Sequence, residues 1–569
     1  MRAMTMTKAI SKTYMLLALM MVMALFTVAA HAAAPGITGP TFNLTAQPAY
    51  LTQPDGQSVY SWGYGCNGAP SGYAPAAMTT ATTTFCNPMQ VPGPTLIVTE
   101  GQTVTVNLTN GLPTAAGNTS ILFPGFSVCI GTISTGVCTP SGAGTNGVAG
   151  LLTQEAIPGG TVSYSFVASS PGTRAYYSGT QGDLQVEMGL YGAIIVLPNA
   201  VPSACTTGLA ASNLTVEGIW GESDFRLAAA AYDHPKSCYD REYLFQFSEM
   251  DPNIHTQAFN QVQAANCTLT SSGALPSTCR LEVPTEPYHP AYFLINGRSM
   301  PDDMDPNYAK EYPHQPYNGN PHMHPGEQVL IRVIGQGRWQ HPFHEHGNHV
   351  RILARDGNLI LSQADANSLA GPLMFTTTTT PGLAFDGIFY WTAKGLNWDP
   401  YGHNPASNDP NAKLTCTPDA NGYNTGVGLT PAQTTAIQSA INYYEWCQDH
   451  NKPVQANPFG DVAGGGPTTL PDPNLFTNGP WYGGSPYLGP NATLRATGCS
   501  AGAPAGSCGA TGSTPPSGTI ANPPGSEAGF AFMWHSHNER EITTNNIFPG
   551  GMLMMMLVDS REFVIDESN

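Results

Sequence analysis

The sequence predicts an all-β protein, and its composition and its patterning both point to that class. Only 10% of the 569 residues are charged, while 62 Gly and 50 Pro are present. Few charges combined with many turn-forming residues are typical of short strands joined by many turns. Runs of alternating or continuous apolar residues, bounded by Pro and Gly, indicate strands along the chain. The clearest of these runs are residues 95–107, 161–167, 192–197, 240–247, 292–296 and 328–334.

The N-terminal segment has the features of a cleaved export signal. Arg2, Lys8 and Lys12 precede an apolar run over residues 14–28, and small residues follow it. The run has about 15 residues, fewer than the roughly 20 that span a bilayer, so cleavage is favoured over a retained anchor. We therefore predict a signal peptide over residues 1–33, no membrane span after its cleavage, and export to the periplasm or the extracellular space.

The cysteines support export. All twelve lie after the predicted signal, and they form couples that are close in sequence. An even number of cysteines in an exported, loop-rich chain indicates disulfides, although spacing does not fix their connectivity. The couples are Cys66/Cys86, Cys129/Cys138, Cys205/Cys238, Cys267/Cys279, Cys416/Cys447 and Cys499/Cys508.

The strand-like runs fall into two blocks, which predict two domains. We expect the first domain over residues 34–199, a linker over 200–235 and the second domain over 236–569. Within the second domain, residues 397–526 form a long insertion rich in Gly, Pro, Asn and Thr, with one expected helix over 431–446. Structureless loops of such length are uncommon in compact domains, so we expect a disulfide-stapled excursion with a role at the surface or in assembly.

The charge balance excludes one class of partner. The chain has 20 Lys+Arg against 38 Asp+Glu, a formal net charge of −18. Binding to phosphates requires a basic patch, and the few basic residues are scattered. We therefore expect no nucleic-acid partner. Nothing in the sequence identifies a small-molecule substrate, and formation of a homo-oligomer stays open.

Two short histidine motifs carry the candidate chemistry. One is the HPFHEHG segment 341–347 and the other is the HSH segment 535–537, whereas residues between Ala32 and Asp233 include no histidine. On a strand, residues i and i+2 share a face, so two neighbouring H-x-H strands would bring four imidazoles together. Neutral imidazole is a preferred ligand of copper, zinc and iron. The candidate metal ligands are His341, His344, His346, His535 and His537.

Simpler interpretations of these histidines remain open. They could be polar surface residues or members of a hydrogen-bonded network in the core. Strand alternation places Glu345 on the face opposite His344 and His346, so it is not expected to bind the same ion. Another H-x-H, His322-Met323-His324, lies among Asn, Pro and Gly and could form a separate metal site in a loop.

Together with these motifs, residues 91–113 (VPGPTLIVTEGQTVTVNLTNGLP) resemble the multicopper oxidases. The likeness spans roughly residues 85–197, 240–396 and 529–558, and the order of its motifs is similar to that of the two-domain laccases. The resemblance implies two cupredoxin-like, Greek-key β-sandwich or barrel domains, and it makes copper the first metal to test, with zinc, iron or manganese as alternatives. Further matches are Pro171-Gly172-Thr173, Gly189-Leu190-Tyr191-Gly192-Ala193, Ile295-Asn296-Gly297-Arg298 and Gly551-Met552.

The chain departs from the family at most of the copper-binding positions. Where the family has HxHG and WYHSH in its first domain, this chain has residues 122–125 (LFPG) and 175–179 (AYYSG). In the last motif, Ser536 stands at the position of the cysteine and Glu541 at that of the following histidine. Of the eight histidines that hold the family's trinuclear cluster, the resemblance leaves four here, with His341 as the one remaining ligand of the mononuclear copper.

These losses limit the chemistry that the resemblance implies. A blue copper site depends on a thiolate, which a serine hydroxyl cannot replace, and four imidazoles cannot hold three coppers. We therefore expect no laccase-type reduction of dioxygen, but an exported copper-binding protein with a reduced, histidine-only site in the second domain, whose oxidoreductase activity stays open. On the other side of the strand, His341, Ser536 and Glu541 could hold a hard ion weakly. The alternative is a catalytically inactive cupredoxin scaffold with a cell-surface, structural or metal-delivery role.

Overall fold

A computed structural model describes most of the two predicted domains. The described residues are 34–76, 86–140, 147–206, 224–392, 417–420, 422–424, 447, 484–487, 529–559 and 565, with residues 266, 269, 271–275 and 277–278 excepted. The predicted signal peptide, the helix expected over 431–446 and most of the insertion lie outside them. Among the described residues, no helix has the length and apolar character that crossing a membrane would require.

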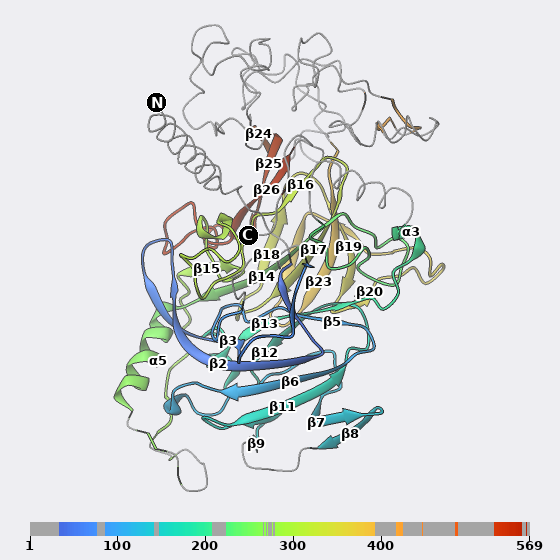
Figure 1. Cartoon of the computed structure of the whole chain (residues 1–569). Coiled ribbons are helices and arrows are strands. Elements are labelled where there is room, and N and C mark those ends of the chain that lie inside the picture. The colour runs from blue at the N-terminus through green and yellow to red at the C-terminus, as the bar shows by residue number, and fades with distance from the viewer. Residues whose placement is uncertain are drawn as a thin grey trace, which may run out of the picture.

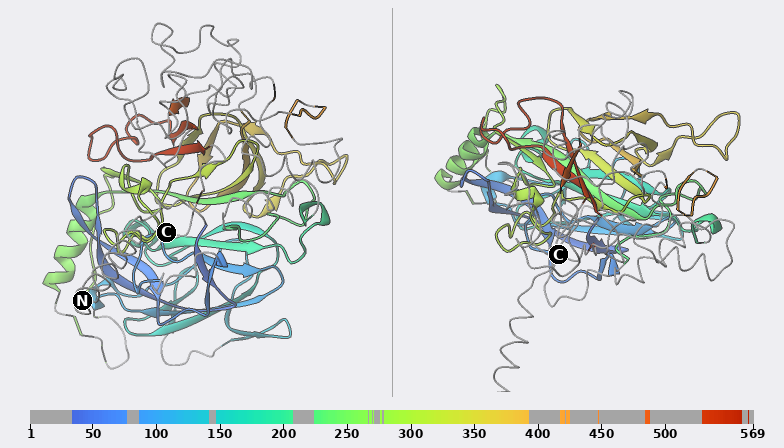
Figure 2. Two further views of the ribbon diagram at one scale, coloured as in Figure 1. Left: turned by 45° about the horizontal axis from the view of Figure 1, so that its top comes forward. Right: turned by 90° about the horizontal axis from the view of Figure 1, so that it is seen from above.

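The described part of the chain is built from β-sheets with few helices, as the sequence predicts. Its strands form two packed sandwiches, one of blue and cyan strands and one of mainly yellow and red strands (Figure 1). In the left view of Figure 2 the same two groups of strands again lie one above the other, with helix α5 on the flank. The fold class is therefore confirmed as all-β with two sandwiches of strands, whereas the cupredoxin-like assignment and the exact limits of the two domains stay predictions.

The first sandwich pairs a five-stranded sheet with a six-stranded sheet. The five-stranded sheet has the order β12 (Gly172–Tyr177), β13 (Tyr191–Leu197), β5 (Leu96–Thr99), β1 (Gly36–Thr38) and β4 (Gly72–Ala74). The six-stranded sheet has the order β3 (Ser58–Cys66), β2 (Thr41–Thr52), β6 (Thr103–Asn110), β11 (Thr161–Val167), β7 (Cys129–Ser134) and β8 (Val137–Pro140). A separate ribbon joins β9 (Gly147–Ala149) and β10 (Gln154–Ala156).

The second sandwich has the same plan. One sheet runs β15 (Tyr292–Ile295), β14 (Arg241–Met250), β17 (Gln328–Gly335), β23 (Ala384–Tyr390), β19 (Val350–Arg355) and β20 (Asn358–Leu359), with β21 (Leu373–Met374) also on β19. The other runs β16 (His322–Met323), β26 (Leu553–Asp559), β25 (Gly529–Ser536), β18 (His341–Glu345) and β22 (Thr376–Thr379), with β24 (Gly484–Tyr487) also on β25.

The described helices are short apart from α5. They are α2 (Gly182–Gln185), α3 (Ser203–Thr206), α5 (Pro252–Ala264), and the 3-10 turns η2 (Thr114–Ala116) and η3 (Asp302–Met304). Asp251 caps α5, because its carboxylate accepts a hydrogen bond from the backbone N–H of Asn253 at 2.9 Å, and Pro252 begins the helix.

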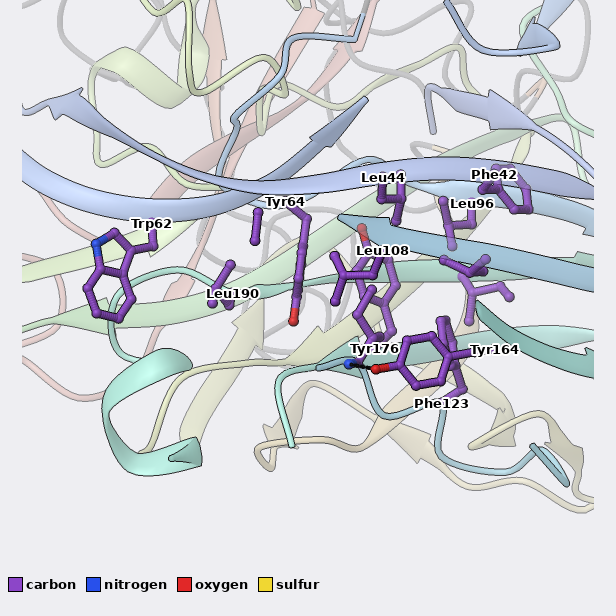
Figure 3. Close-up of a cluster of buried hydrophobic side chains, with 14 of the residues drawn as sticks. Phe42, Leu44, Trp62, Tyr64, Leu96, Leu108, Phe123, Tyr164, Tyr176 and Leu190 are labelled. Carbon is purple, nitrogen blue, oxygen red and sulfur yellow. Dashed lines mark hydrogen bonds between the residues drawn. The ribbon is translucent and has the colours of Figure 1, made fainter. Parts of the chain in front are cut away.

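Each sandwich has its own apolar core. In β6 the buried and partly exposed residues alternate along the strand, so Val104, Val106 and Leu108 all point inward. They meet a cluster of aromatic side chains between the two sheets (Figure 3). The aromatic members of that cluster labelled in the figure are Phe42, Trp62, Tyr64, Phe123, Tyr164 and Tyr176.

The predicted disulfides form wherever both cysteines are described. The bonds are Cys66–Cys86, Cys129–Cys138, Cys205–Cys238 and Cys267–Cys279. The couples Cys416/Cys447 and Cys499/Cys508 include cysteines outside the described residues. Four of the six predicted pairings are therefore confirmed.

A buried polar network connects the two sandwiches. The carboxylate of Asp386 on β23 accepts a hydrogen bond from Thr173 Oγ1 on β12 at 2.6 Å and another from the hydroxyl of Tyr232. Arg332 on β17 donates to Thr173 Oγ1 at 3.1 Å and to the carboxylate of Glu242 at 2.9 Å. These side chains are almost fully buried, so most of their polar atoms pair with one another across the contact between the sandwiches, and one guanidinium nitrogen of Arg332 stays without a partner.

Candidate metal centre

The two histidine motifs lie on neighbouring strands. Strands β18 and β25 pair in antiparallel fashion, and the register places His344 opposite His535 and Phe343 opposite Ser536. Cross-strand partners on one face of a sheet have side chains in contact range. The two H-x-H motifs, about 190 residues apart in sequence, therefore face the same space.

Four imidazole rings converge there. The ring centre of His344 lies 4.8 Å from that of His346, 4.8 Å from that of His537 and 5.5 Å from that of His535. His346 and His535 have ring centres 5.2 Å apart, and their Nε2 atoms are separated by 3.3 Å. One nitrogen from each of His344, His346 and His535 lies within 4.8 Å of the others. His537, whose side chain is exposed, is the fourth member and lies at the edge of the group that faces solvent.

Hydrogen bonds orient two of the rings. Nδ1 of His344 lies 2.6 Å from the hydroxyl oxygen of Thr376 on β22. Nδ1 of His535 lies 2.7 Å from the carbonyl oxygen of Ser536, which can only accept, so this nitrogen carries the proton. An imidazole that donates through one nitrogen offers the lone pair of the other to a metal. Nε2 of His535 is therefore available as a ligand atom.

The electrostatics of the cluster keep two of its imidazoles, those of His344 and His535, neutral. Burial and the neighbouring His346, His535 and His537 lower the pKa of His344 to about 4. Burial is also the main cause that lowers the pKa of His535. Neutral imidazole is the form that binds metals. The donor set therefore fits a single ion that prefers nitrogen ligands, such as copper or zinc.

Glu345 takes no part in this cluster. It is fully buried on the opposite face of β18, as strand alternation predicts. Burial raises the pKa of its carboxyl group well above the usual range.

His341 lies apart from the other four predicted ligands. Its Nδ1 is 2.9 Å from a carboxylate oxygen of Glu541, and its Nε2 is 2.9 Å from a carboxylate oxygen of Glu249. Ser536, which stands at the position of the family's cysteine, donates its hydroxyl proton to Glu541. Both nitrogens of His341 are thus engaged with carboxylates, and the group contains no thiolate.

The third H-x-H motif is part of a sheet and not of a loop. His322 lies on β16, which pairs in parallel with β26. Its Nδ1 is 2.6 Å from a carboxylate oxygen of Asp559, and Nδ1 of His324 is 3.0 Å from the backbone carbonyl of the same residue. Burial lowers the pKa of His322 well below its ordinary value. These two histidines therefore hold Asp559 at the end of β26, and they do not form the metal site in a loop that the sequence left open.

The first-domain positions at which the family has histidines hold packed or cavity-lining residues. Leu122 and Tyr177 face each other as an isolated bridge. A Cβ added to Gly179 would lie only 2.8 Å from Cγ of Leu122, so the leucine fills the space beside the glycine. Leu122, Tyr177 and Gly179 line one side of a cavity of about 280 Å³, with Gln336 and Pro381 on the other. This region offers no imidazole, so the residues do not fit a copper cluster of the family's size.

Two residues of the site could not be recognised from the sequence. Thr376, which orients His344, lies in a run of five threonines that indicates only a strand. Glu249, which contacts His341, is the penultimate residue of β14, a strand in which apolar residues are mixed with polar ones. A charged residue within a strand could have drawn attention to Glu249. The sequence does not show that its partner is His341, which lies 92 positions away.

Comparisons with known proteins agree with the motif resemblance in one part of the chain. Residues 70–201 match a family model described as multicopper oxidase. No curated protein gives a significant match. The matched segment has no histidine, so the scaffold, and not the copper ligands, carries this match.

Several solved structures are similar to the chain at low sequence identity. A structure titled multicopper oxidase mgLAC has 14% identity and a TM-score of 0.41, with 91% of this chain and 86% of that chain covered. A blue copper oxidase from Nitrosomonas europaea has 14% identity and a TM-score of 0.39, with coverages of 91% and 85%. A copper nitrite reductase from the same organism has 17% identity and a TM-score of 0.33, with coverages of 62% and 84%.

Proposed function

From the premise that residues 70–201 carry a multicopper oxidase domain, we propose that the chain is an exported copper-binding protein with one histidine-only site. The ligands are His344 on β18, His535 on β25, and His346 and His537, each of which directly follows one of these strands. The observation that carries the proposal is the convergence of three imidazole nitrogens within 4.8 Å, with Nδ1 of His344 and of His535 already hydrogen-bonded. Such outer hydrogen bonds fix ring orientation in metal sites.

The protein's own residues define what such a site could do. A single copper ion with an exchangeable coordination position supplies Lewis acidity or one-electron chemistry. The exposed His537 leaves one side of the site accessible from solvent, whereas Thr376 holds His344 from the inner side. Because the first-domain positions hold Leu122 and Gly179, the four-copper chemistry of laccases is not part of the proposal.

Metal analysis tests this function directly. The purified, exported protein is reconstituted with Cu²⁺, and bound copper, zinc, iron and manganese are measured by mass spectrometry. We expect one copper per chain in the wild type and none at stoichiometric level in His344→Ala/His537→Ala. The matched control is His349→Ala, because His349 packs on Phe375 at 4.9 Å between ring centres but is not in the cluster. A wild type without stoichiometric metal would contradict the proposal.

A non-enzymatic role is the second candidate, favoured by the absence of a thiolate beside His341 and Ser536. Without that group, the described residues around His341 form no blue copper centre to accept electrons, and bound copper would be stored or delivered. The two roles are separated by comparing turnover of peroxide or a phenol by the copper-loaded protein with the rate at which a chelator removes the metal. Transfer without turnover supports delivery.

A further inference from the structure

A buried histidine is clamped between two carboxylates at the place where the family resemblance implies a mononuclear copper. The side chain of His341 is fully buried, and those of Glu249 and Glu541 are also buried. One carboxylate lies 2.9 Å from each ring nitrogen. The ring therefore bridges strand β14, which carries Glu249, and the segment after β25, which carries Glu541.

Both carboxylates are held by further hydrogen bonds. Glu541 accepts from the hydroxyl of Ser536 and from the side-chain amide of Asn538 at 2.9 Å. Glu249 accepts from the backbone N–H groups of Arg338 at 2.6 Å and Trp339 at 2.8 Å. These hydrogen bonds hold both carboxylates in position, so they oppose reorientation of the carboxylates by a metal ion.

The geometry leaves no common position for a metal ion. The two ring nitrogens point away from each other, so an ion bound at one nitrogen could contact only one of the two carboxylates. Binding there would also break a charge-assisted hydrogen bond and leave a buried carboxylate without its partner, which is costly. The hydroxyl of Ser536 is already donated to Glu541.

The charged groups around His341 are predominantly acidic. From β14 comes Glu249, and from the segment after β25 comes Glu541, while Ser536 and Tyr288 contribute neutral hydroxyls. Tyr288 lies 3.4 Å from Glu249 and donates to Glu187 at 2.7 Å. The guanidinium of Arg338 points instead to the exposed carboxylate of Glu286 at 2.7 Å, and that of Arg540 donates to the backbone carbonyl of Pro290 at 3.2 Å. Two buried carboxylates facing one ring thus favour the doubly protonated imidazolium.

We propose that this Glu249–His341–Glu541 clamp is a metal-free substitute for the mononuclear copper site. The imidazolium of His341 supplies the positive charge at this position and prevents copper from binding there. Its two hydrogen bonds also connect β14 and β18 to residues 537–541. The clamp is independent of the proposed function, because it contains none of the four clustered histidines. In agreement, burial opposes protonation of His341, but the hydrogen bonds and charges of Glu249 and Glu541 outweigh it and raise its pKa to about 9.

Nuclear magnetic resonance of protein labelled in its histidine rings tests the charge of the clamp. At pH 7.5 we expect one buried ring that is protonated on both nitrogens, with its signal absent from His341→Gln. In Glu541→Gln that ring should lose its proton at a pH at least one unit lower than in the wild type. Glu286→Gln, which removes an exposed carboxylate, should leave it unchanged. A neutral His341 ring in the wild type at pH 7.5 would overturn the proposal.

Copper binding by the wild type is a second test, and its result does not depend on whether a variant folds. Crystals of the wild type are exposed to excess Cu²⁺, and anomalous scattering locates the bound ions. We expect no copper within bonding distance of His341, whether or not the four-histidine cluster is loaded. Copper bound to His341 would refute the clamp, while an empty cluster would count against the proposed function alone.

Discussion

Nε2 of His346 lies 3.3 Å from Nε2 of His535. Two imidazole lone pairs would repel each other at this separation, so Nε2 of His346 carries the proton and donates it to Nε2 of His535. Nδ1 of His535 already donates to a carbonyl, and the pKa of His535 is lowered chiefly by burial. A cation bound by both nitrogens would take the place of the proton that they share.

The contribution of His346 can be measured by its removal. His346→Ala takes away one of the three nitrogens that lie within 4.8 Å of one another. We expect the affinity for copper to fall by about 100-fold or more, since even the loss of an outer hydrogen-bond partner costs 10–100-fold. Competition titration against a copper chelator gives the affinities, and His349→Ala should retain that of the wild type.

Thr376 should affect copper binding without touching the metal. Thr376→Val removes the hydroxyl that lies 2.6 Å from Nδ1 of His344 and preserves the shape of the side chain. We expect the copper affinity to fall by about 10-fold, because the ring loses the group that fixes its orientation. Thr378→Val, at an exposed position of the same strand, is the control. Equal affinities in the two variants would mean that Thr376 does not orient the ring.

The clamp around His341 should make stability depend on pH. The pKa of His341 in the folded protein is about 9, above the value of about 6.5 for an unfolded histidine. The stabilisation is thus fully present below about pH 6.5 and is lost as the pH rises through about 9. The shift corresponds to on the order of 3 kcal/mol.

Urea unfolding at pH 6.5 and pH 10, with the disulfides kept intact, measures this loss. The wild type should lose more unfolding free energy between the two values than His341→Gln, which has no imidazole to titrate. Identical losses in the two proteins would show that other groups cause the pH dependence.

Asp386 should be essential to the contact between the two sandwiches. Asp386→Ala leaves the hydroxyls of Tyr232 and Thr173 without their shared buried acceptor and removes one of the two carboxylates that pair with Arg332. We expect a loss of about 3–5 kcal/mol in unfolding free energy, as when one partner of a buried ion pair is removed. Glu286→Ala, at an exposed ion pair with Arg338, should cost about 1 kcal/mol or less. Chemical denaturation of the two variants provides the comparison.

The sequence predicts the strands of this fold better than their assignment to sheets. Residues 95–107 have the pattern of one continuous strand, but the structure divides them into β5 and β6, which belong to different sheets. Gly101, with φ of +83°, lies in the turn between them. A strand's pattern reports which side chains are buried, whereas its sheet depends on contacts with distant segments.

The candidate site was predicted only in part for the same reason. The two H-x-H motifs identify His344, His346, His535 and His537 as neighbours because i and i+2 share a strand face. Alternation along the strand places His341 on the face opposite His344, but it does not show that both ring nitrogens of His341 meet carboxylates. Their environments differ through residues that are remote in sequence, since Glu249 and Glu541 lie 92 and 200 positions from His341.

The sequence by itself determined the all-β class, the local cysteine couples that form disulfides and the two strands that carry the H-x-H motifs. Each of these follows from the spacing or the alternation of residues that are close in sequence. Only the tertiary structure decided that four imidazoles share one space while a fifth is clamped by two carboxylates. Hydrogen bonds and charges act over a few ångströms in space, whatever the separation along the chain, so they cannot be read from the order of the residues.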